Sequence, residues 1–284
     1  MMTTVGYIGL GAMGSAMTEW LLSNDRSMVV FDLDDAAMHK AVEQGATALG
    51  SAAEVAAQAD VLSICVPAAE HIDAVFNGEQ GIAEGAHPGL TVLIHSTVHP
   101  DTIASAQQAA APGSVQVFDA CVAGGAEAAK TGELAMFVGG WDDMSPQVRS
   151  VVESYGSKVI DGGPVGSGAA LKIGVNVMTY MQQAAGRISF ALMDNVGAET
   201  QSLVEAWRHI GQLGTLTEQY LGLLGIPDEH ITGAFQESLA GAASLGVKDL
   251  GLARELGSVT PELDAVLDAL IASMPQVMRA TNDE

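Results

Sequence analysis

The amino-terminal segment from Val5 to Gly14 constrains this chain more than any other. It reads Val-Gly-Tyr-Ile-Gly-Leu-Gly-Ala-Met-Gly, an apolar run that leads directly into Gly-x-Gly-x-x-Gly, and a helix-prone stretch follows at 15–22. In such a strand–turn–helix unit, the first glycine permits the tight turn and the second lets the backbone approach a pyrophosphate, while the third lets the helix pack close to the sheet. The pattern therefore predicts a dinucleotide-binding turn made of Gly9, Leu10, Gly11, Ala12, Met13 and Gly14.

A second apolar run, at 28–31, ends in an acidic residue that indicates which dinucleotide is bound. Asp32 follows Gly14, the last glycine of the turn, at close to the spacing of about 20 residues that is expected for the acid that binds the adenosine ribose. Its carboxylate can accept hydrogen bonds from a free 2′-hydroxyl, whereas a 2′-phosphate would meet like charge. Asp34 and Asp35 add two acids, and the arginine that NADP usually requires is missing from this stretch. We expect NAD rather than NADP, although the glycines alone also fit an ordinary turn of an α/β protein.

The balance of charges limits the partners of this chain. Its 11 Lys and Arg residues against 34 Asp and Glu give a formal net charge of −23. Such a surface repels nucleic acid and anionic membranes, and we expect neither as a partner. The same field opposes an anionic substrate, so a site for one must concentrate local positive charge. The few lysines therefore become candidates for a functional site.

Cysteine and histidine usage predicts neither a disulfide framework nor a metal site. The cysteines, Cys65 and Cys121, show no Cys-x-x-Cys or Cys/His spacing, and the seven histidines are scattered. No apolar run reaches the roughly 18 residues of a membrane span, and no basic segment precedes the first apolar stretch as in a signal peptide. We expect a soluble protein of the reducing cytoplasm.

Short β-type runs alternate with alanine-rich helical segments in the first part of the chain. The predicted strands are 5–8, 28–31, 47–49, 61–66, 91–95, 115–119, 134–138 and 158–160. Most connecting segments are long enough for the crossover helices that parallel strands require. We predict an α/β fold with a Rossmann-type doubly wound parallel sheet, whose ligand crevice lies at the carboxyl ends of the strands.

The pattern becomes all-helical after Pro164. Residues 165–195 read as one long helix, and helical periodicity continues from 196 to 278. A chain of 284 residues has room for two domains. We predict an NAD-binding domain at 1–163 and an all-helical substrate or dimerisation domain at 164–284, joined by the long helix.

Lys172 and Asn176, near the start of that long helix, are the strongest candidates for chemistry. They stand four residues apart and therefore share a helix face. A lysine among Ala, Leu, Ile and Val is partly desolvated, and burial, the helix N-terminus and a cationic nicotinamide would each lower its pKa. Such a group can take the proton of an alcohol as hydride leaves, while Asn176 orients the ammonium or the substrate oxygen. Considered alone, the pair also fits a snorkelling lysine beside a helix-capping asparagine.

A second glycine-containing loop is predicted within 118–127, after a strand and before a short helix. It contains Ala123, Gly124 and Gly125. Consecutive glycine amides at a helix start can bind a carboxylate, although a flexible connector would show the same residues.

Two further segments follow predicted strands, and a third stands late in the chain. Val66 and Pro67 end one strand, and Thr97 follows the next, which would place its hydroxyl near the nicotinamide ribose. Lys248-Asp249 sets a lysine beside an acid, and by itself this pair favours an exposed surface position.

Together these segments resemble the β-hydroxyacid dehydrogenase family, which includes 3-hydroxyisobutyrate dehydrogenases and tartronate semialdehyde reductases. The resemblance runs from residue 5 to about residue 270 and rests on six segments in order: 9–14, 65–67, 96–98, 119–125, 166–176 and 248–249. Members of the family join an NAD(P)-binding Rossmann domain to an all-helical domain through a long helix. Dimers or tetramers with the helical domain as the interface are usual, so the resemblance implies a homodimer or homotetramer.

The resemblance also implies a role for each candidate residue. Lys172 would be the catalytic acid/base, assisted by Asn176, and the substrate carboxylate would be held by backbone amides of Gly124 and Gly125 beside Ala123. The implied activity is NAD-dependent hydride transfer to or from a small-molecule 3-hydroxy acid or a related alcohol. The cofactor would contact the turn at 9–14, Asp32, Val66, Pro67, Thr97 and Lys248.

The chain departs from the family pattern in the second glycine loop, which usually reads Asp-Ala-Pro-Val-Ser-Gly-Gly. Ala123 replaces the serine whose hydroxyl normally contacts the substrate, and Cys121 replaces a proline. Losing a hydroxyl donor to a charged acceptor costs about 1.5–3 kcal/mol of binding, so other groups compensate or the substrate is bulkier. Cys121 has no base beside it in the sequence, and we expect it to pack as a small apolar residue.

Two alternatives stay open at the level of sequence. An imine reductase would use the same scaffold, but those enzymes usually replace the lysine and favour NADP, so Lys172 and Asp32 argue against it. A non-catalytic dinucleotide-binding protein would keep the fold without needing Lys172 and Asn176 together.

Overall fold

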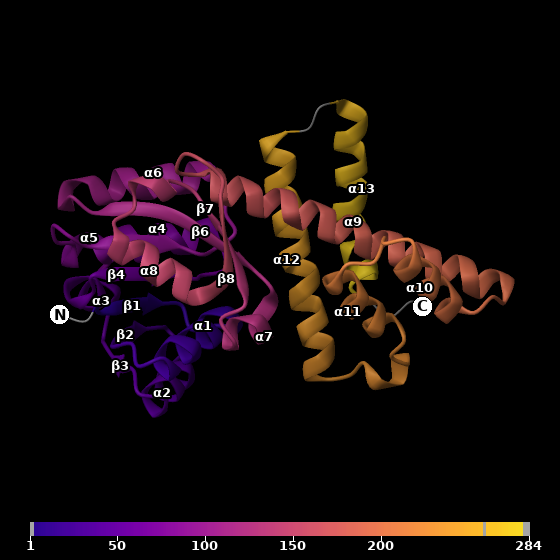
Figure 1. The fold of residues 1–284 in the computed structure, drawn as a ribbon, viewed down its shortest axis with the longest axis horizontal. Coiled ribbons are helices and arrows are strands. Elements are labelled where there is room, and N and C mark those ends of the chain that lie inside the picture. The colour runs from indigo at the N-terminus through magenta and orange to yellow at the C-terminus, as the bar shows by residue number, and fades with distance from the viewer. Residues whose placement is uncertain (1–2, 258–259, 281–284) are drawn as a thin grey trace. The chain divides into compact units, whose positions relative to one another are not determined.

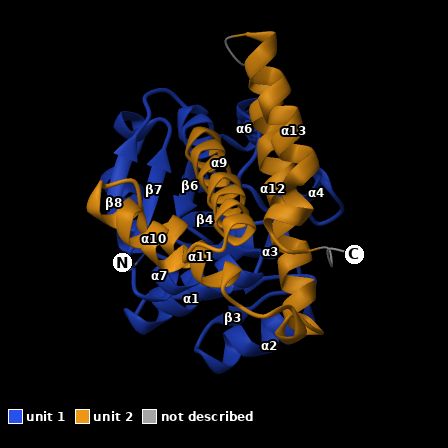
Figure 2. Cartoon of the chain, turned by 90° about the vertical axis from the view of Figure 1, so that its right-hand side faces the viewer, with its two compact units in different colours: residues 1–172 blue, residues 173–284 orange. Residues whose placement is uncertain are grey.

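The first part of the chain forms a sheet covered by helices. The computed structural model describes residues 3–257 and 260–280, and the chain divides into two compact units, residues 1–172 and 173–284 (Figure 2). In the described part of the first unit, eight strands follow the order β3-β2-β1-β4-β5-β6-β7-β8. They are β1 (Val5–Ile8), β2 (Met28–Phe31), β3 (Thr47–Ala48), β4 (Val61–Ile64), β5 (Thr91–Ile94), β6 (Gln116–Ala123), β7 (Leu134–Val138) and β8 (Gly156–Asp161) (Figure 1).

Helices cover both faces of this sheet, as β1 demonstrates. A Cβ on Gly6 would approach Val55 to 2.8 Å, whereas the next residue, Tyr7, donates its hydroxyl hydrogen to Met17 Sδ at 3.2 Å. Neighbouring strand residues point to opposite faces, so the helices that carry Val55 and Met17 lie on opposite sides. This confirms the doubly wound architecture. The helices of the unit are α1 (Ala12–Ser23), α2 (Asp35–Glu43), α3 (Ala52–Gln58), α4 (Ala69–Asn77), α5 (Ile82–Gly85), α6 (Pro100–Ala110), α7 (Gly125–Lys130) and α8 (Pro146–Tyr155), with 3-10 turns at Ala111–Gly113 and Trp141–Asp143.

One part of the predicted parallel sheet is wrong. β7 runs antiparallel to β6, with Ala120 opposite Val138, and β8 then runs parallel to β7. The connection from β6 to β7 holds only the six-residue helix α7, which is too short for the crossover of a dozen or more residues that a parallel pair needs. This pairing also extends β6 to Ala123, so residues that we assigned to a loop belong to a strand.

A chain of buried polar groups joins α8 to the central strands. His95, immediately after β5, places Nδ1 2.6 Å from the carbonyl oxygen of Ala120 and Nε2 2.9 Å from Ser63 Oγ, which lies 2.9 Å from the Tyr155 hydroxyl. A carbonyl only accepts, so Nδ1 carries the hydrogen and Nε2 accepts from Ser63. Ser63 Oγ in turn accepts from Tyr155. The donor and the acceptor are therefore fixed for each hydrogen bond from Tyr155 through Ser63 and His95 to Ala120.

The burial of His95 opposes its protonation. Desolvation lowers the pKa of His95 from 6.5 to about 4, against the smaller upward effect of the hydrogen bond to Ala120. The neutral ring matches the chain of hydrogen bonds, because a protonated Nε2 could no longer accept from Ser63.

Among its described residues, 173–257 and 260–280, the second unit contains helices and connecting loops but no strand, which confirms the predicted all-helical region. Its helices are α9 (Ser167–Val196, which begins in the first unit), α10 (Thr200–His209), α11 (Thr215–Leu224), α12 (Ala234–Leu256) and α13 (Pro261–Val277), with a 3-10 turn at Asp228–His230. α12 and α13 pack closely at Gly246, where a Cβ would lie 2.5 Å from Met274 Cε. No helix among the described residues is long and apolar enough to cross a membrane.

The depressed pKa of His95 predicts a specific loss of stability in acid. The unfolded chain binds a proton near pH 6.5, whereas folded His95 stays neutral down to about pH 4. The contribution of neutral His95 to the free energy of unfolding is therefore fully present above pH 6.5. It is lost as the pH falls from 6.5 to 4, by about 3 kcal/mol in total. Urea unfolding followed by circular dichroism at pH 7, 6, 5 and 4.5 measures this slope.

A substitution isolates the effect. His95→Gln should flatten the decline over that pH range, whatever its stability at pH 7, while replacement of the exposed His39 by Gln should leave the wild-type slope. Equal slopes in the wild type and His95→Gln would contradict the assignment.

Candidate active site at the carboxyl edge of the sheet

The glycine turn after β1 has the geometry that its sequence predicts. Gly9 adopts a φ of +95°, which non-glycine residues rarely adopt. A Cβ on Gly14 would lie 1.9 Å from the Gly9 carbonyl oxygen, so this glycine permits the close approach of α1 to the strand end. At Gly11, by contrast, a Cβ would meet nothing within 4 Å, and the residue is exposed. The turn is therefore tight behind Gly9 and Gly14 and open at Gly11.

Asp32, which follows β2, binds to this turn. Its Oδ2 accepts from the backbone N–H of Leu10 at 2.5 Å, and its Oδ1 accepts from the N–H of Asp34 at 2.8 Å. An ionised carboxylate has about four acceptor positions, so both oxygens can still accept from a ligand hydroxyl. The acid and the turn thus form one contiguous surface, although they stand far apart in the sequence.

The segments that follow β4 and β5 are joined by a side chain. Ser96 Oγ accepts from the backbone N–H of Val66 at 2.9 Å. Pro67 is exposed, and Thr97 is half-buried directly after Ser96. β1 is paired with β2 on one side and with β4 on the other, so these segments lie beside the switch point at which ligands bind in open α/β sheets.

The second glycine segment begins inside a strand. Cys121 is fully buried in β6 and donates its thiol hydrogen to the Ser96 carbonyl oxygen at 3.4 Å, in agreement with the predicted packing role. Ala123, the last residue of β6, is half-buried. Gly124 and Gly125 are exposed with φ of +134° and +77°, which leaves their backbone accessible at the start of α7.

A buried carboxylate in β6 determines where α9 begins. Asp119 is inaccessible to solvent, and its Oδ1 and Oδ2 accept from the backbone N–H groups of Gly166 at 2.7 Å and Ala169 at 2.8 Å. These are amides of the first helical turn, which lack partners within the helix. A Cβ on Gly139 would lie 2.4 Å from Asp119 Oδ1, and one on Gly168 would lie 2.9 Å from Oδ2, so a side chain at either position would collide with the carboxylate.

Lys172 follows that anchored turn by three residues. It is half-buried on α9, as expected for a lysine among apolar neighbours. Its position is therefore defined by the strand carboxylate that caps the same helix, rather than by a mobile loop.

Asn176, one turn further along α9, belongs to the helical unit and contacts α12 there. Its Nδ2 donates to Asp249 Oδ2 at 2.6 Å, and the Tyr180 hydroxyl donates to the same oxygen at 3.1 Å. Lys248 Nζ lies 3.0 Å from Asp249 Oδ1. The expected surface pair is wrong for Asp249, which is only 6 % exposed, because the hydrogen bonds to α9 hold it inside the unit.

The candidate residues therefore fall into two groups. The turn at 9–14, Asp32, Val66, Pro67, Thr97, Ala123, Gly124, Gly125 and Lys172 belong to the first unit, whereas Asn176 and Lys248 belong to the second. Sequence reasoning missed Asp119 as a helix cap and missed the role of Asp249 and Tyr180. The available signal was weak: Asp249 stands in an apolar stretch with Val247 and Leu250, and Tyr180 shares a helix face with Asn176.

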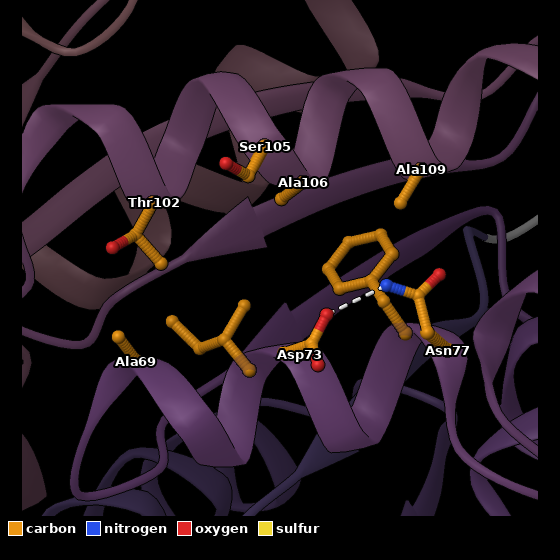
Figure 3. Close-up of a pocket in the computed structure, with 9 residues that line it drawn as sticks. Ala69, Asp73, Asn77, Thr102, Ser105, Ala106 and Ala109 are labelled. Carbon is orange, nitrogen blue, oxygen red and sulfur yellow. Dashed lines mark hydrogen bonds between the residues drawn. The ribbon is translucent and has the colours of Figure 1, made fainter.

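A hollow between α4 and α6 does not contribute to this site. The residues that line it include the apolar Ile72 and Phe76, and Asn77 Nδ2 donates to Asp73 Oδ1 at 2.7 Å beside it (Figure 3). None of the candidate residues lines it. Within residues 3–257 and 260–280, no three His, Cys, Asp or Glu side chains lie close enough together to bind a metal ion.

Comparison with known proteins shows the family of this chain. Residues 4–163 match the family model described as the NAD binding domain of 6-phosphogluconate dehydrogenase. An uncharacterized oxidoreductase of Mycobacterium tuberculosis is 33 % identical over 90 % of this chain and 86 % of that protein. The NAD-dependent L-serine dehydrogenase of Pseudomonas aeruginosa is 31 % identical over 89 % of this chain and 85 % of its own length.

Solved structures agree with these relatives. The 3-hydroxyisobutyrate dehydrogenase of Mycobacterium tuberculosis, solved with L-serine, covers 98 % of this chain and 99 % of its own, with a TM-score of 0.81 and 26 % identity. The family model covers the sheet, and the relatives also cover the helices that follow. The chain belongs to the β-hydroxyacid dehydrogenase family of oxidoreductases.

Proposed function

We propose that this enzyme transfers a hydride between the carbinol carbon of a 3-hydroxy acid and the nicotinamide of NAD, with Lys172 as the acid/base. The observation that carries the proposal is the placement of Lys172. A half-buried lysine stands just after the helix turn that the buried Asp119 carboxylate holds against β6. A lysine held in this way suits proton transfer at a defined point.

The residues around the glycine turn fit a dinucleotide. The open, exposed backbone at Gly11 leaves room for a pyrophosphate beside the N-terminus of α1. The Asp32 carboxylate, which lies against the same turn, accepts hydrogen bonds from the two ribose hydroxyls of an unphosphorylated adenosine. Val66, Pro67 and Thr97 lie at the ends of the next strands of the sheet. When bound, NAD supplies the hydride acceptor.

Lys172 moves the proton. In the oxidative direction its neutral amine takes the hydroxyl proton of the substrate, while the carbinol hydrogen leaves with its electron pair to the cofactor. The products are a carbonyl compound, reduced cofactor and an ammonium. In the reductive direction the ammonium returns the proton to the alkoxide. Asn176 assists this exchange by orienting the polar groups one helical turn away.

The carboxylate of the substrate binds at Gly124 and Gly125 in this proposal. Their exposed backbone and positive φ angles leave the N–H groups accessible to an anion. Ala123 offers no hydroxyl, so the amides carry the recognition and the methyl group leaves space for a substituent. The relatives named for L-serine and 3-hydroxyisobutyrate act on 3-hydroxy acids, which supports the same class of substrate here.

The alternatives receive less support. An imine reductase has no need of a proton-accepting lysine at this position, and the acids around Asp32 disfavour NADP. A non-catalytic dinucleotide-binding protein would leave the placement of Lys172 without a use. We further place the enzyme in the cytoplasm, where cysteines stay reduced.

We also propose that the enzyme is a homodimer or homotetramer that associates through α9. Ile188, Leu192 and Val196 stand at successive helical turns and are 62 %, 54 % and 73 % exposed. An exposed apolar stripe of this kind marks an interaction surface. A second copy of the chain presents the same stripe, which suits a two-fold interface.

Replacement of Lys172 tests the reaction. Lys172→Ala should lower kcat by about 10²–10⁴-fold, because proton transfer loses its acceptor, while the affinity for NAD stays unchanged. Turnover is followed at 340 nm with L-serine and 3-hydroxyisobutyrate, and binding by NADH fluorescence. Lys158→Ala, which removes an exposed lysine of the same unit, serves as the charge-matched control. Full turnover in Lys172→Ala would overturn the proposal.

The cofactor preference rests on Asp32. Asp32→Ala should raise the KM for NAD by about 10-fold or more, because hydrogen bonds from the ribose to a charged group are lost, and should raise the ratio of NADP to NAD turnover. Asp35→Ala removes an exposed acid close by and should change neither value. An unchanged ratio in Asp32→Ala would show that Asp32 does not select the cofactor.

The interface is tested by light scattering after gel filtration. Replacing Ile188 and Leu192 together by Glu should shift the mass toward the monomer, because buried charges would face each other across the interface. Val42→Glu, at an exposed apolar position of α2, should leave the mass unchanged. A stripe variant that keeps the wild-type mass would exclude this surface.

A further inference from the structure

The contact between α9 and α12 contains a carboxylate that the proposed reaction does not use. Asp249 is buried and accepts two hydrogen bonds on Oδ2, from Asn176 Nδ2 at 2.6 Å and from the Tyr180 hydroxyl at 3.1 Å. Its other oxygen, Oδ1, lies 3.0 Å from Lys248 Nζ. All four residues lie in the helical unit, so this arrangement is internal to it.

A carboxylate at this position determines which way the Asn176 amide faces. An ionised carboxylate only accepts hydrogen bonds, whereas an amide donates at its nitrogen and accepts at its oxygen. The nitrogen of Asn176 must therefore face Asp249. In the flipped orientation the amide oxygen of Asn176 would face Asp249 Oδ2 within hydrogen-bonding distance. The hydrogen bond would be lost and the two oxygens would repel each other.

Tyr180 restrains the carboxylate in turn. It stands one helical turn after Asn176, so both donors come from the same face of α9. A Cβ on Gly246 of α12 would lie 3.3 Å from Tyr180 Cε1, so the ring rests against a residue without a side chain. Burial and the charge of Asp249 raise the pKa of Tyr180, and the hydroxyl remains a donor at neutral pH.

We propose that Asp249 is a positioning residue that acts through Asn176, by holding the amide nitrogen toward α12 and turning the amide oxygen away from it. Asn176 then offers a hydrogen-bond acceptor, which matches the ammonium of Lys172 one turn earlier on the helix. The inference rests on the proposed role of Lys172. It assigns Asn176 the part of an acceptor that orients the ammonium, and it assigns Asp249 and Tyr180 the support of that acceptor.

A kinetic double-mutant cycle tests the proposal in the full-length enzyme. Asp249→Leu should lower kcat about 10- to 100-fold in the wild-type background, the range expected when a hydrogen bond to a charged group is lost. In the Asn176→Ala background the same change should have an effect of less than about threefold, because residues that act in series are not additive. A full repeated loss in that background would overturn the proposal.

Conservative variants separate orientation from charge. Asp249→Asn keeps an acceptor that can face Asn176 and Tyr180, so it should retain most of the kcat that Asp249→Leu loses. Tyr180→Phe should lower kcat by about threefold to tenfold, since one hydrogen bond to the carboxylate is removed. Tyr220→Phe removes a buried hydrogen bond to the Val277 carbonyl in the same unit and should leave kcat unchanged. Equal losses in Asp249→Asn and Asp249→Leu, or in Tyr180→Phe and Tyr220→Phe, would contradict the assignment.

Two controls keep the outcomes distinct. Circular dichroism and NADH fluorescence establish that each variant is folded and binds cofactor, and if Asp249→Leu does not fold, the cycle is run with Tyr180→Phe against Asn176→Ala. Turnover that survives in Lys172→Ala would overturn the proposed function itself. Loss in Lys172→Ala combined with additive Asp249 and Asn176 effects would overturn the positioning role alone.

Discussion

The buried carboxylate of Asp119 carries the connection between the sheet and α9. Two oxygens meet two backbone N–H groups of the first helical turn, and no neutral side chain of this shape offers the same match, since an asparagine would turn a donor toward one of the amides. An amide left unsatisfied in this buried place costs about 1–3 kcal/mol. Gly139 and Gly168 leave the carboxylate its room. The position of Lys172, and hence the proposed chemistry, depends on this contact.

Similar contacts between side chains and backbone hold the segments at the strand ends in place. Asp32 reaches Leu10, Ser96 reaches Val66, and Cys121 reaches the Ser96 carbonyl. Each contact links segments that follow different strands, so neighbouring loops restrain one another. Binding groups held in this way lose little conformational entropy when a ligand arrives.

Most of the fold was predictable because its signals are local. Hydrophobic runs and glycine turns mark β1 and β2 in the sequence, and the all-helical character after Pro164 follows from periodicity. The reversal of β7 was not predicted, although the short connection through α7 contains the reason. Asp249 was beyond local reasoning, because an acid beside a lysine looks exposed until the helix that buries it is in place. Lys172 and Asn176 were predictable as a pair only from their spacing. The Asp119 cap at the start of α9 and the hydrogen bond from Asn176 to Asp249 are tertiary contacts, which the spacing does not reveal.

Because β7 runs in the opposite direction, the two halves of the sheet have different roles. β1, β2, β4 and β5 run in one direction and end together at the loops that suit a dinucleotide. β7 runs the other way, and Gly139, directly after it, returns to donate its N–H to the Asp119 carbonyl oxygen at 3.0 Å. β7 and β8 therefore support the start of α9 and do not add to the nucleotide-binding edge of the sheet. Substitutions in these two strands would change the alignment of the proton-transfer lysine without altering the surface that selects the cofactor.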